Sequence, residues 1–330
     1  MNILVTGATG FLGSRIVEHL LSENKINLII ATGRKVKNDA QISHSKLHYI
    51  LGDLRNRSFV IRLFEKSIDV VINCASLSSP WGSKKEFCEA NITTQKHLID
   101  TSIKTSVKRF IYISSPSIYF DFNDAIGINE NSQIPKRMVN QYAKTKWRAE
   151  NLLRESKLPH IILRPRALIG RGDTVIMPRL IRSSMEEKLK IIGSGKNVVD
   201  LTPVSNMVEA VRLSIFTQNY NETYNISNGE PVNLWKSINY ILTAIGLPSI
   251  NKKIPYPVLY IVASIMEYKS QLFTKKEPIL TRYSVGILAK SFTFDIQKAR
   301  NKLKFQPKQT TAQALEEFIQ WYKEKNNDNG

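Results

Sequence analysis

A tyrosine and a lysine four residues apart are the first candidates for chemistry. Tyr142 and Lys146 lie in a stretch with helical spacing, which places both side chains on one side of a helix. An ammonium group near a phenol favours the phenolate, so Lys146 should lower the pKa of Tyr142 from its ordinary value of about 10. Such a phenol can give or take the proton of a carbonyl/alcohol pair. Because one such pair is expected by chance among 12 tyrosines, its location must support the interpretation.

A serine-rich segment supplies a hydroxyl that would assist the tyrosine. It follows the apolar run at 110–113 and contains Ser114, Ser115 and Ser117. Each of them could hold a substrate oxygen by a hydrogen bond while the tyrosine transfers the proton. The residues by themselves leave the choice among the three open.

A glycine-containing turn near the N-terminus predicts a dinucleotide site. It follows the apolar run at 3–5 and precedes a helix expected to begin near residue 11. Glycines let the backbone turn tightly and approach a pyrophosphate, and the helix N-terminus offers N–H groups and a positive dipole end. The spacing is Gly-x-x-Gly-x-x-Gly, which indicates a loop distinct from Gly-x-Gly-x-x-Gly. The predicted cofactor contacts in this turn are Gly7, Thr9, Gly10, Phe11, Leu12 and Gly13.

The residues after the second predicted strand indicate which nicotinamide is preferred. NAD-binding loops usually carry an acidic residue there, which holds the ribose 2′-hydroxyl. Here the strand at 28–32 is followed by Gly33, Arg34 and Lys35, with no carboxylate before Asp39. A guanidinium group suits a 2′-phosphate, and a carboxylate would repel it. We therefore predict NADP(H) in preference to NAD(H); the alternative is that Arg34 only stacks on the adenine.

The elements that position these residues alternate between strand and helix patterns. This alternation predicts an α/β fold, a Rossmann-type doubly wound parallel sheet, with a smaller, mainly helical C-terminal substrate domain. The dinucleotide-binding domain is expected at 1–165, with 197–227 returning to it, and the substrate domain at 166–196 and 228–330. Strands are expected at 3–5, 28–32, 47–51, 70–75, 110–114 and 161–164, and helices at 59–66, 94–106 and 139–156.

Composition limits the other classes of function. The 330 residues are 42% hydrophobic, and Cys74 and Cys88 have neither a disulfide framework nor metal-ligand neighbours, so we expect reduced thiols, no metal and a cytoplasmic location. The net charge of +19 favours anionic partners. Compositional drift and a weak contact with a membrane surface both remain open, whereas no nucleic-acid partner is expected because no nucleic-acid motif accompanies the charge.

One apolar stretch, at 254–266, has two interpretations. It is too short to span a bilayer, which needs about 20 apolar residues. Lys252 and Lys253 before it and Lys269 after it would suit a helix lying among lipid headgroups. A helix in the core or lining a substrate pocket is the favoured interpretation.

These segments together resemble the extended short-chain dehydrogenase/reductase superfamily. The resemblance covers residues 2–321 and is carried by residues 6–13, Asp53-Leu54, Asn73-Cys74-Ala75, Ser115, the Tyr142/Lys146 pair and Arg164-Pro165. Segments at 74–82, 115–120, 164–170 and 225–231 resemble the 3β-hydroxysteroid dehydrogenase-like branch, in particular bacterial 2-alkyl-3-oxoalkanoate reductases of olefin biosynthesis.

The resemblance implies roles for individual residues. Ser115, four residues before Tyr119, would be the catalytic hydroxyl, Tyr142 the acid/base, and Lys146 the group that lowers its pKa and holds the ribose hydroxyls. Cofactor contacts are further implied for Asp53 and Leu54 at the adenine, Ala75 along the backbone and Pro165 at the nicotinamide. Asn91 would be structural, and its usual Gly-Thr companion is replaced by Thr94-Gln95, which affects only local packing.

The expected reaction is an NADPH-dependent reduction of a β-keto group to a β-hydroxyl. The substrate would be hydrophobic, a 2-alkyl-3-oxoalkanoate or similar β-ketoacyl compound, with Arg166 and Arg171 as candidates for meeting a carboxylate or thioester. The pocket is predicted to include Ser78, Trp81, Tyr119, Arg166 and Met177. The alternatives are a 3β-hydroxysteroid-type dehydrogenase working oxidatively, an NAD-dependent sugar-nucleotide epimerase or dehydratase, and a non-catalytic NADP-binding redox sensor. A homodimer is a further hypothesis.

Overall fold

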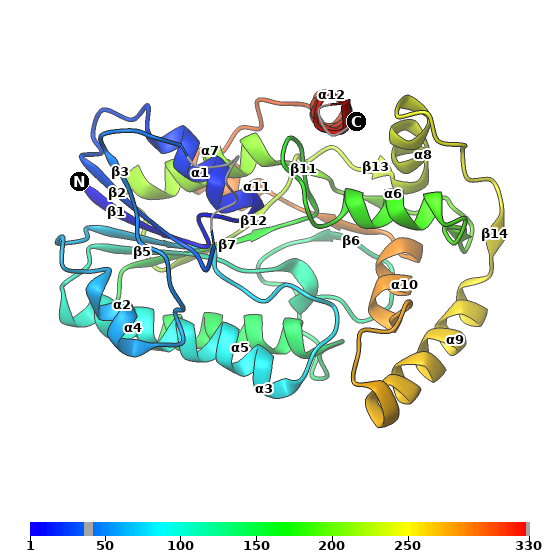
Figure 1. Cartoon of the computed structure of the whole chain (residues 1–330), viewed down its shortest axis with the longest axis horizontal. Coiled ribbons are helices and arrows are strands. Elements are labelled where there is room, and N and C mark those ends of the chain that lie inside the picture. Colours follow the sequence, from blue (N-terminus) through cyan, green and yellow to red (C-terminus); the bar gives the residue numbers. More distant parts are fainter. Residues whose placement is uncertain (36–41, 328–330) are drawn as a thin grey trace.

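A seven-stranded parallel sheet forms the centre of the computed structural model, which describes residues 1–35 and 42–327 (Figure 1). The chain places two strands on one side of β1 and then returns to place four on the other side, so the strand order reverses next to β1. In such sheets, ligands bind beyond the carboxyl ends of the strands at the reversal. From one edge to the other, the strands are β12 (Glu222–Ile226), β7 (His160–Pro165), β5 (Arg109–Ile113), β4 (Val70–Asn73), β1 (Asn2–Thr6), β2 (Leu28–Thr32) and β3 (Leu47–Tyr49).

The central strands are apolar along their whole length because both faces of the sheet are buried. In β1, Ile3 and Val5 join the hydrophobic cluster on one face, whereas Leu4 joins the cluster on the other. Side chains alternate between the faces of a strand, so a strand covered on both sides reads as an unbroken apolar run. This is why residues 3–5 could be recognised as a strand without an alternating pattern.

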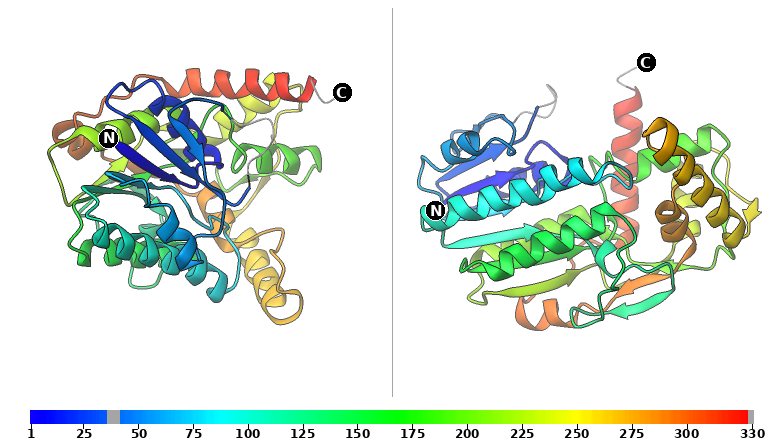
Figure 2. Two further views of the ribbon diagram at one scale, coloured as in Figure 1. Left: turned by 60° about the vertical axis from the view of Figure 1, so that its left-hand side comes forward. Right: turned by 90° about the horizontal axis from the view of Figure 1, so that it is seen from below.

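Helices form a layer on each face of the sheet (Figures 1 and 2). One layer contains α1 (Phe11–Leu20) and α7 (Val204–Phe216), which pack against each other over β1, β5 and β7. The opposite layer contains α2 (Arg57–Arg62), α4 (Thr94–Lys104) and α5 (Gln141–Glu155). The short helix α3 (Lys84–Phe87) and the π-helix η2 (Cys88–Thr93) lead directly into α4, and a 3-10 turn, η3 (Pro116–Ile118), follows β5.

The remaining segments form a second part at the carboxyl ends of the strands, on the right in Figure 1. It has its own hydrophobic cluster, centred on Trp235 and Phe318. Its strands are β6 (Ala125–Ile128), β10 (Val198–Val199), β13 (Val232–Asn233) and β15 (Phe292–Phe294) in one sheet, with the pairs β8 (Leu168–Ile169)/β11 (Thr202–Pro203) and β9 (Ile191–Ile192)/β14 (Lys253–Ile254). Its helical segments are α6 (Met177–Met185), α8 (Leu234–Ala244), α9 (Tyr256–Lys269), η4 (Ser270–Thr274), α10 (Arg282–Ala289) and α12 (Thr311–Asn327).

The predicted fold class is confirmed: a Rossmann-type parallel sheet carries helices on both faces and a smaller, helix-rich C-terminal part. Two contacts cross the predicted domain boundaries. Strand β6 pairs with β15, and α11 (Gln297–Lys302) packs on β12 of the central sheet. The boundaries themselves remain a prediction.

Helix α9 is not a core helix, which was one part of the favoured interpretation, and its role in lining a substrate pocket stays a prediction. Of its 14 residues, only Ala263 and Glu267 are buried, and several large apolar side chains are exposed to solvent. The apolar composition of the stretch could not distinguish a buried helix from one whose apolar face has no partner. Within residues 1–35 and 42–327, no helix is both long and apolar enough to cross a membrane.

Candidate active site

The turn after β1 is closely packed at two of its glycines. Gly7 has a φ of +66°, and a Cβ there would lie 2.8 Å from the backbone nitrogen of Ala75. A Cβ on Gly13 would lie 2.1 Å from the carbonyl oxygen of Gly7, so α1 begins directly against the turn. Gly10, the N-cap of α1, has no side chain to occupy the N–H groups of the first turn. The turn therefore fits the pyrophosphate of a dinucleotide, with these N–H groups as donors.

A buried polar network fixes the backbone that passes this turn. The Thr6 hydroxyl donates to Asn73 Oδ1 over 2.5 Å, and Asn73 Nδ2 donates to Gln95 Oε1 over 2.6 Å. The same Asn73 oxygen accepts from the Ala75 N–H at 3.1 Å. These bonds connect β1, β4 and α4 at the reversal point of the sheet. Gln95, at a position where the family pattern has another residue, therefore contributes to positioning Ala75.

Charged residues surround the expected adenine and ribose position. Arg34 is exposed just after β2, and the Asp53 carboxylate is held by Arg55 with a shortest N–O distance of 2.6 Å. The hydrogen bond from Arg55 is the largest cause of the lowered pKa of Asp53, and Arg34 adds to it by its charge. Arg55 was not predicted from the sequence, although its place two residues after Asp53 was a usable signal. Asp39 lies outside the described residues.

The predicted catalytic residues come together at the carboxyl end of β5. Helix α5 begins at Gln141, because the Asn140 side chain caps it by accepting from the Ala143 N–H at 2.9 Å. This start places Tyr142 in the first turn, where its hydroxyl interacts with the side chain of Ser115. One turn later, the ammonium group of Lys146, only 2% exposed, donates to the carbonyl oxygen of Ile113 at 2.7 Å.

The structure separates the three candidate serines. Ser115 is the one beside the Tyr142 hydroxyl, and it also lies 2.9 Å from the hydroxyl of Ser117. Ser114 points instead toward Glu150. Ser117 therefore supports Ser115, and Ser114 faces away from the phenol. A further hydroxyl near Tyr142, that of Ser76, was not predicted because no motif marks it.

The pKa of Tyr142 differs from the sequence-based expectation. Burial raises the pKa of Tyr142 to about 12, although its contacts with Ser115 and Ser76 act in the opposite direction. The predicted lowering by Lys146 is not found, since the ammonium is directed to Ile113 and lies 6.0 Å from the centre of the Tyr142 ring. Burial also lowers the pKa of Lys146 to about 8. Tyr142 is therefore a protonated acid over the ordinary pH range.

Comparison with known proteins agrees with this arrangement of turn, strands and catalytic side chains. A model of the NAD dependent epimerase/dehydratase family matches residues 3–227. The chain belongs to this family. The resemblance to extended short-chain dehydrogenases/reductases is thereby confirmed, and the chain is an NAD(P)-dependent oxidoreductase.

Individual members of the extended short-chain family align over most of the chain. A 2-alkyl-3-oxoalkanoate reductase from Shewanella oneidensis is 30% identical, covering 90% of this chain and 80% of the relative. The human sterol-4-alpha-carboxylate 3-dehydrogenase, decarboxylating, is 26% identical, covering 97% of this chain and 87% of the relative. The solved UDP-glucose 4-epimerase of Thermotoga maritima has a TM-score of 0.78 at 22% identity, covering 99% of this chain and all of that one, which shows the shared fold.

Two of the residues predicted to line the pocket of this family member lie in its core. Tyr119 is 5% exposed, and its hydroxyl donates to Asn225 and accepts from Arg164. Met177, at the start of α6, is 3% exposed in the C-terminal hydrophobic cluster. Sequence position alone could not show that these side chains turn inward, and their place in the pocket lining stays a prediction. Ser78 is exposed and Trp81 is half-buried.

The substrate side contains a residue that the motifs did not reveal. Tyr283 of α10 interacts electrostatically with Tyr142 and with Arg166, so it is near both the catalytic phenol and the end of β7. Its ring packs edge-to-face on Phe120, with centroids 6.0 Å apart. No local sequence signal marks it, because α10 reaches the site only through the tertiary fold.

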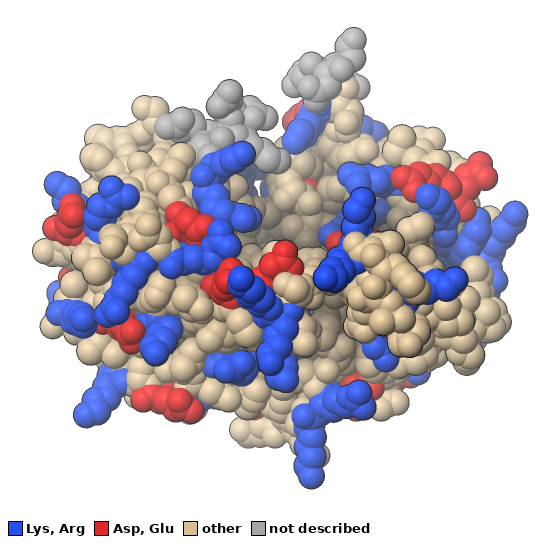
Figure 3. Space-filling view, turned by 60° about the horizontal axis from the view of Figure 1, so that its bottom comes forward, with Lys and Arg blue, Asp and Glu red and all other residues tan. Residues whose placement is uncertain are grey.

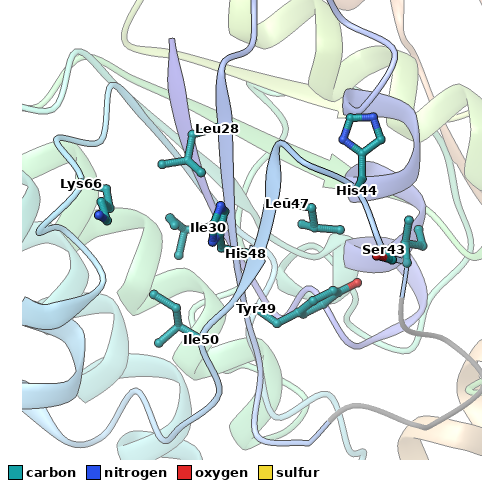
Figure 4. Close-up of a pocket in the computed structure, with 10 residues that line it drawn as sticks. Leu28, Ile30, Ser43, His44, Leu47, His48, Tyr49, Ile50 and Lys66 are labelled. Atoms are coloured by element: carbon teal, nitrogen blue, oxygen red, sulfur yellow. The ribbon is translucent and has the colours of Figure 1, made fainter.

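Two hollows are visible at the surface. Figure 3 shows a recess between the two parts of the molecule, bordered by Lys and Arg side chains. A separate depression of about 770 Å³ lies on the outer edge of the sheet, where Leu28, Ile30, Leu47 and Tyr49 line it (Figure 4). It contains no predicted site residue and follows β2 and β3 along their length, away from Tyr142.

Proposed function

We propose that this oxidoreductase uses NADPH to reduce the β-keto group of a hydrophobic 3-oxo acid or similar β-ketoacyl compound. The observation that carries the proposal is the meeting of Tyr142 with Ser115 at the carboxyl end of β5, one helical turn from Lys146. A phenol whose pKa is about 12 holds its proton at neutral pH, so it is suited to donate to a developing alkoxide. This supports the reductive direction.

Each residue then has a defined task. Ser115 donates a hydrogen bond to the keto oxygen and orients it, and Tyr142 gives that oxygen its proton as the carbonyl becomes an alcohol. Lys146 supplies a fixed positive charge below the phenol. The turn at Gly7 and Gly13 would hold the pyrophosphate, and a bound reduced nicotinamide supplies the hydride.

The substrate class is supported by the named relatives. The bacterial relative is named for reduction of a 2-alkyl-3-oxoalkanoate, and the human relative for a sterol 4-carboxylate. In both names an acid group stands close to the carbon that is oxidised or reduced. The sterol relative also favours a second candidate, an oxidative 3β-hydroxy acid dehydrogenase, but a phenol protonated at neutral pH is a weaker base than that direction needs.

Removal of the phenolic hydroxyl tests the catalytic assignment. Tyr142→Phe should lower kcat by at least about 100-fold, because a positioned proton donor is lost, while leaving the Kd of NADPH nearly unchanged. Ser115→Ala should also slow turnover, whereas Ser114→Ala, a matched loss of a neighbouring hydroxyl, should have little effect. NADPH oxidation with 3-oxo acids gives the rates, and protein fluorescence gives the Kd. Unchanged turnover in Tyr142→Phe would refute the assignment and favour a non-catalytic NADP sensor.

The NADPH preference rests on the cations after β2 and β3. Arg34 is exposed and close enough to Asp53 to affect its pKa, while Arg55 already neutralises that carboxylate. A 2′-phosphate would therefore meet two guanidinium groups rather than a free carboxylate.

A single substitution tests this preference. Arg34→Ala should raise the Kd of NADPH about tenfold or more and leave that of NADH within about twofold, as expected for loss of a charge-assisted hydrogen bond. Arg148→Ala, which removes an exposed arginine from α5, is the control. Tighter binding of NADH than of NADPH by the unmodified protein would overturn the preference.

A further inference from the structure

We propose that Arg166 binds the acidic group of the substrate, so that the enzyme recognises a 3-oxo acid by its carboxylate as well as by its keto group. This inference rests on the proposed reductase function and defines the substrate at the same site. The residue follows Pro165 at the end of β7, where the peptide backbone is held by a 3.0 Å hydrogen bond from the Arg166 N–H to Ile226.

The guanidinium group of Arg166 is partly buried and forms no ion pair, although the charge of Asp200 acts on it. Its Nε is closed to solvent and has no hydrogen-bond acceptor, and no carboxylate of residues 1–35 or 42–327 forms an ion pair with it. The group lies over the ring of Phe292, with 5.1 Å between its central carbon and the ring centre. Burial accordingly lowers the pKa of Arg166. A buried cation without a partner is costly, and a bound anion would remove that cost.

The groups that face Arg166 do not neutralise it. Asp200 is buried and its Oδ2 accepts from the Phe294 N–H at 2.6 Å, while its Oδ1 has no hydrogen-bond partner and forms no ion pair with Arg166. Burial also raises the pKa of Asp200, which weakens it as a counter-charge. The other neighbour, Tyr283, is a neutral phenol whose pKa burial raises. The positive charge therefore remains available to a ligand.

Tyr283 relates this charge to the catalytic centre. It is close enough to interact with both Tyr142 and Arg166, so the proton donor and the cation are near the same side chain. In a 3-oxo acid, only one carbon separates the keto carbon from the carboxylate carbon. A keto group held at Tyr142 would thus bring its carboxylate toward Arg166, whose planar fork suits a bidentate carboxylate.

The structure also decides between the two arginines that the sequence left open. Arg171 is exposed and paired with Glu18 at 2.7 Å, so it has a partner on the surface. Arg164, two residues before Arg166, is buried but fully paired with Glu150 at 2.5 Å. Of these three arginines, Arg166 is the one that is at least partly buried and forms no ion pair.

Kinetics with an acid and its ester separate recognition of the carboxylate from catalysis. The unmodified enzyme should prefer 3-oxodecanoate to its methyl ester. Arg166→Gln should raise KM for the acid by about 10–100-fold, as expected for a charge-assisted hydrogen bond, and leave the ester within about twofold. Arg166→Lys keeps the positive charge without the planar fork of donors. Its KM for the acid should lie between those of the unmodified enzyme and Arg166→Gln. Arg171→Gln, the matched surface control, should behave as the unmodified enzyme.

A binding measurement keeps the inference testable apart from turnover. Decanoate cannot be reduced, and calorimetry should show that it binds the unmodified protein more tightly than decanol, a difference that Arg166→Gln abolishes. Equal binding of decanoate by both proteins would overturn the role of Arg166. If NADPH is not oxidised with either the acid or the ester, the proposed function fails, whereas equal reduction of both by both proteins refutes only the Arg166 subsite. Circular dichroism confirms that each variant is folded.

A second inference rests on helix α9 and is independent of the active site. We infer that the exposed apolar face of α9 and the segment after it docks on an anionic membrane surface. Val258, Ile261, Ile265 and Tyr268 recur every three or four residues, which places them on one side of α9, and Leu272 follows in η4. The exposed large apolar side chains here are Val258, Ile261, Val262, Ile265, Tyr268, Leu272, Phe273 and Ile279, each between 39% and 79% exposed.

Charge around this apolar face distinguishes a membrane from a second copy of the chain. Lys252 and Lys253 precede α9, and Lys269, Lys275 and Lys276 follow or end it. On the right-hand side of Figure 3, uncharged surface is bordered by Lys and Arg side chains. A symmetric dimer would bring these cations together, whereas anionic headgroups would attract them and the apolar side chains would enter the acyl boundary.

Vesicle binding tests this docking surface. The protein should sediment with phosphatidylglycerol vesicles at low salt, and less at high salt because the attraction is screened. The double variant Ile261→Asp/Ile265→Asp should lose binding, while Ile126→Asp, which alters an equally exposed isoleucine on β6, should retain it. Absence of sedimentation at low salt, or equal binding by the double variant, would overturn the inference. So would a concentration-dependent dimer that the double variant abolishes.

Discussion

The two sides of the candidate active site differ in whether their polar groups have partners within the chain. On the cofactor side, two buried groups have partners within the chain: Asn73 pairs with Gln95, and Arg164 pairs with Glu150. On the substrate side, the partly buried Arg166 lies near Tyr283 and Asp200 but forms no ion pair with a carboxylate of the described residues. Both arginines are at the end of the same strand, two residues apart.

This difference suggests what each side is built to do. A network whose members satisfy one another is complete without ligand and fixes the geometry of the site. A buried charge left without a partner lowers stability unless something else binds it. We therefore interpret the Glu150–Arg164 pair as structural and the Arg166 charge as available for recognition.

The largest effect on stability should come from breaking the ion pair between Glu150 and Arg164. Glu150→Gln leaves the charge of Arg164 buried without its carboxylate, which should lower the free energy of unfolding by about 3–5 kcal/mol. Urea denaturation measures the change. Glu186→Gln, which breaks an exposed pair with Lys188, should leave stability unchanged. A loss no greater than that of the control would contradict the structural role of the pair.

A smaller effect is expected from the closest contact of the glycine-containing turn. In Gly13→Ala the new Cβ would lie 2.1 Å from Gly7 O, so α1 must shift, at a cost of about 1–3 kcal/mol. The Kd of NADPH should rise because the N–H groups of α1 move. An unchanged Kd of NADPH in Gly13→Ala would show that this packing does not position the cofactor.

Most of the cofactor side could be predicted from the sequence because its determinants are local. Gly7 and Gly13 are needed by the turn in which they stand, and an apolar run such as residues 3–5 is sufficient to indicate a buried strand. The Tyr142/Lys146 pair was recognisable for the same reason, since helical spacing places both residues on one side of α5.

The substrate side could not be predicted to the same extent because it is assembled from distant segments. Tyr283 and Arg166 are 117 positions apart and meet only in the folded chain. Tyr119 and α9 are two examples. Tyr119, expected at the pocket, is buried, whereas α9, for which a place in the core or at a pocket was favoured, is exposed. The raised pKa of Tyr142 likewise follows from burial, which residue spacing does not reveal.

The pH dependence of reduction should reveal which of the two catalytic groups limits the rate. The pKa of Lys146 is lowered to about 8 and that of Tyr142 raised to about 12. As pH rises through 8, the ammonium loses its charge while the phenol keeps its proton, so kcat/KM should fall about tenfold per pH unit above 8. Stopped assays across pH 6–10 measure this. In Lys146→Arg the side chain stays charged, so any remaining activity should persist to higher pH. A profile flat to pH 10 would contradict the role of Lys146.

The smallest effect is expected when Arg171 is substituted. This substitution tests whether Arg166 in particular, and not the positive charge of the protein in general, attracts the acid. Its side chain is 44% exposed and its partner Glu18 is equally accessible, so Arg171→Gln should change the free energy of unfolding by less than about 1 kcal/mol. It should change KM for a 3-oxo acid less than twofold. If Arg171→Gln instead weakened binding of the acid as strongly as Arg166→Gln does, the acid would be attracted by the general positive charge of the protein. Raising the ionic strength would then weaken acid binding in both variants, whereas recognition by the partly buried Arg166 should be screened much less than attraction at the surface.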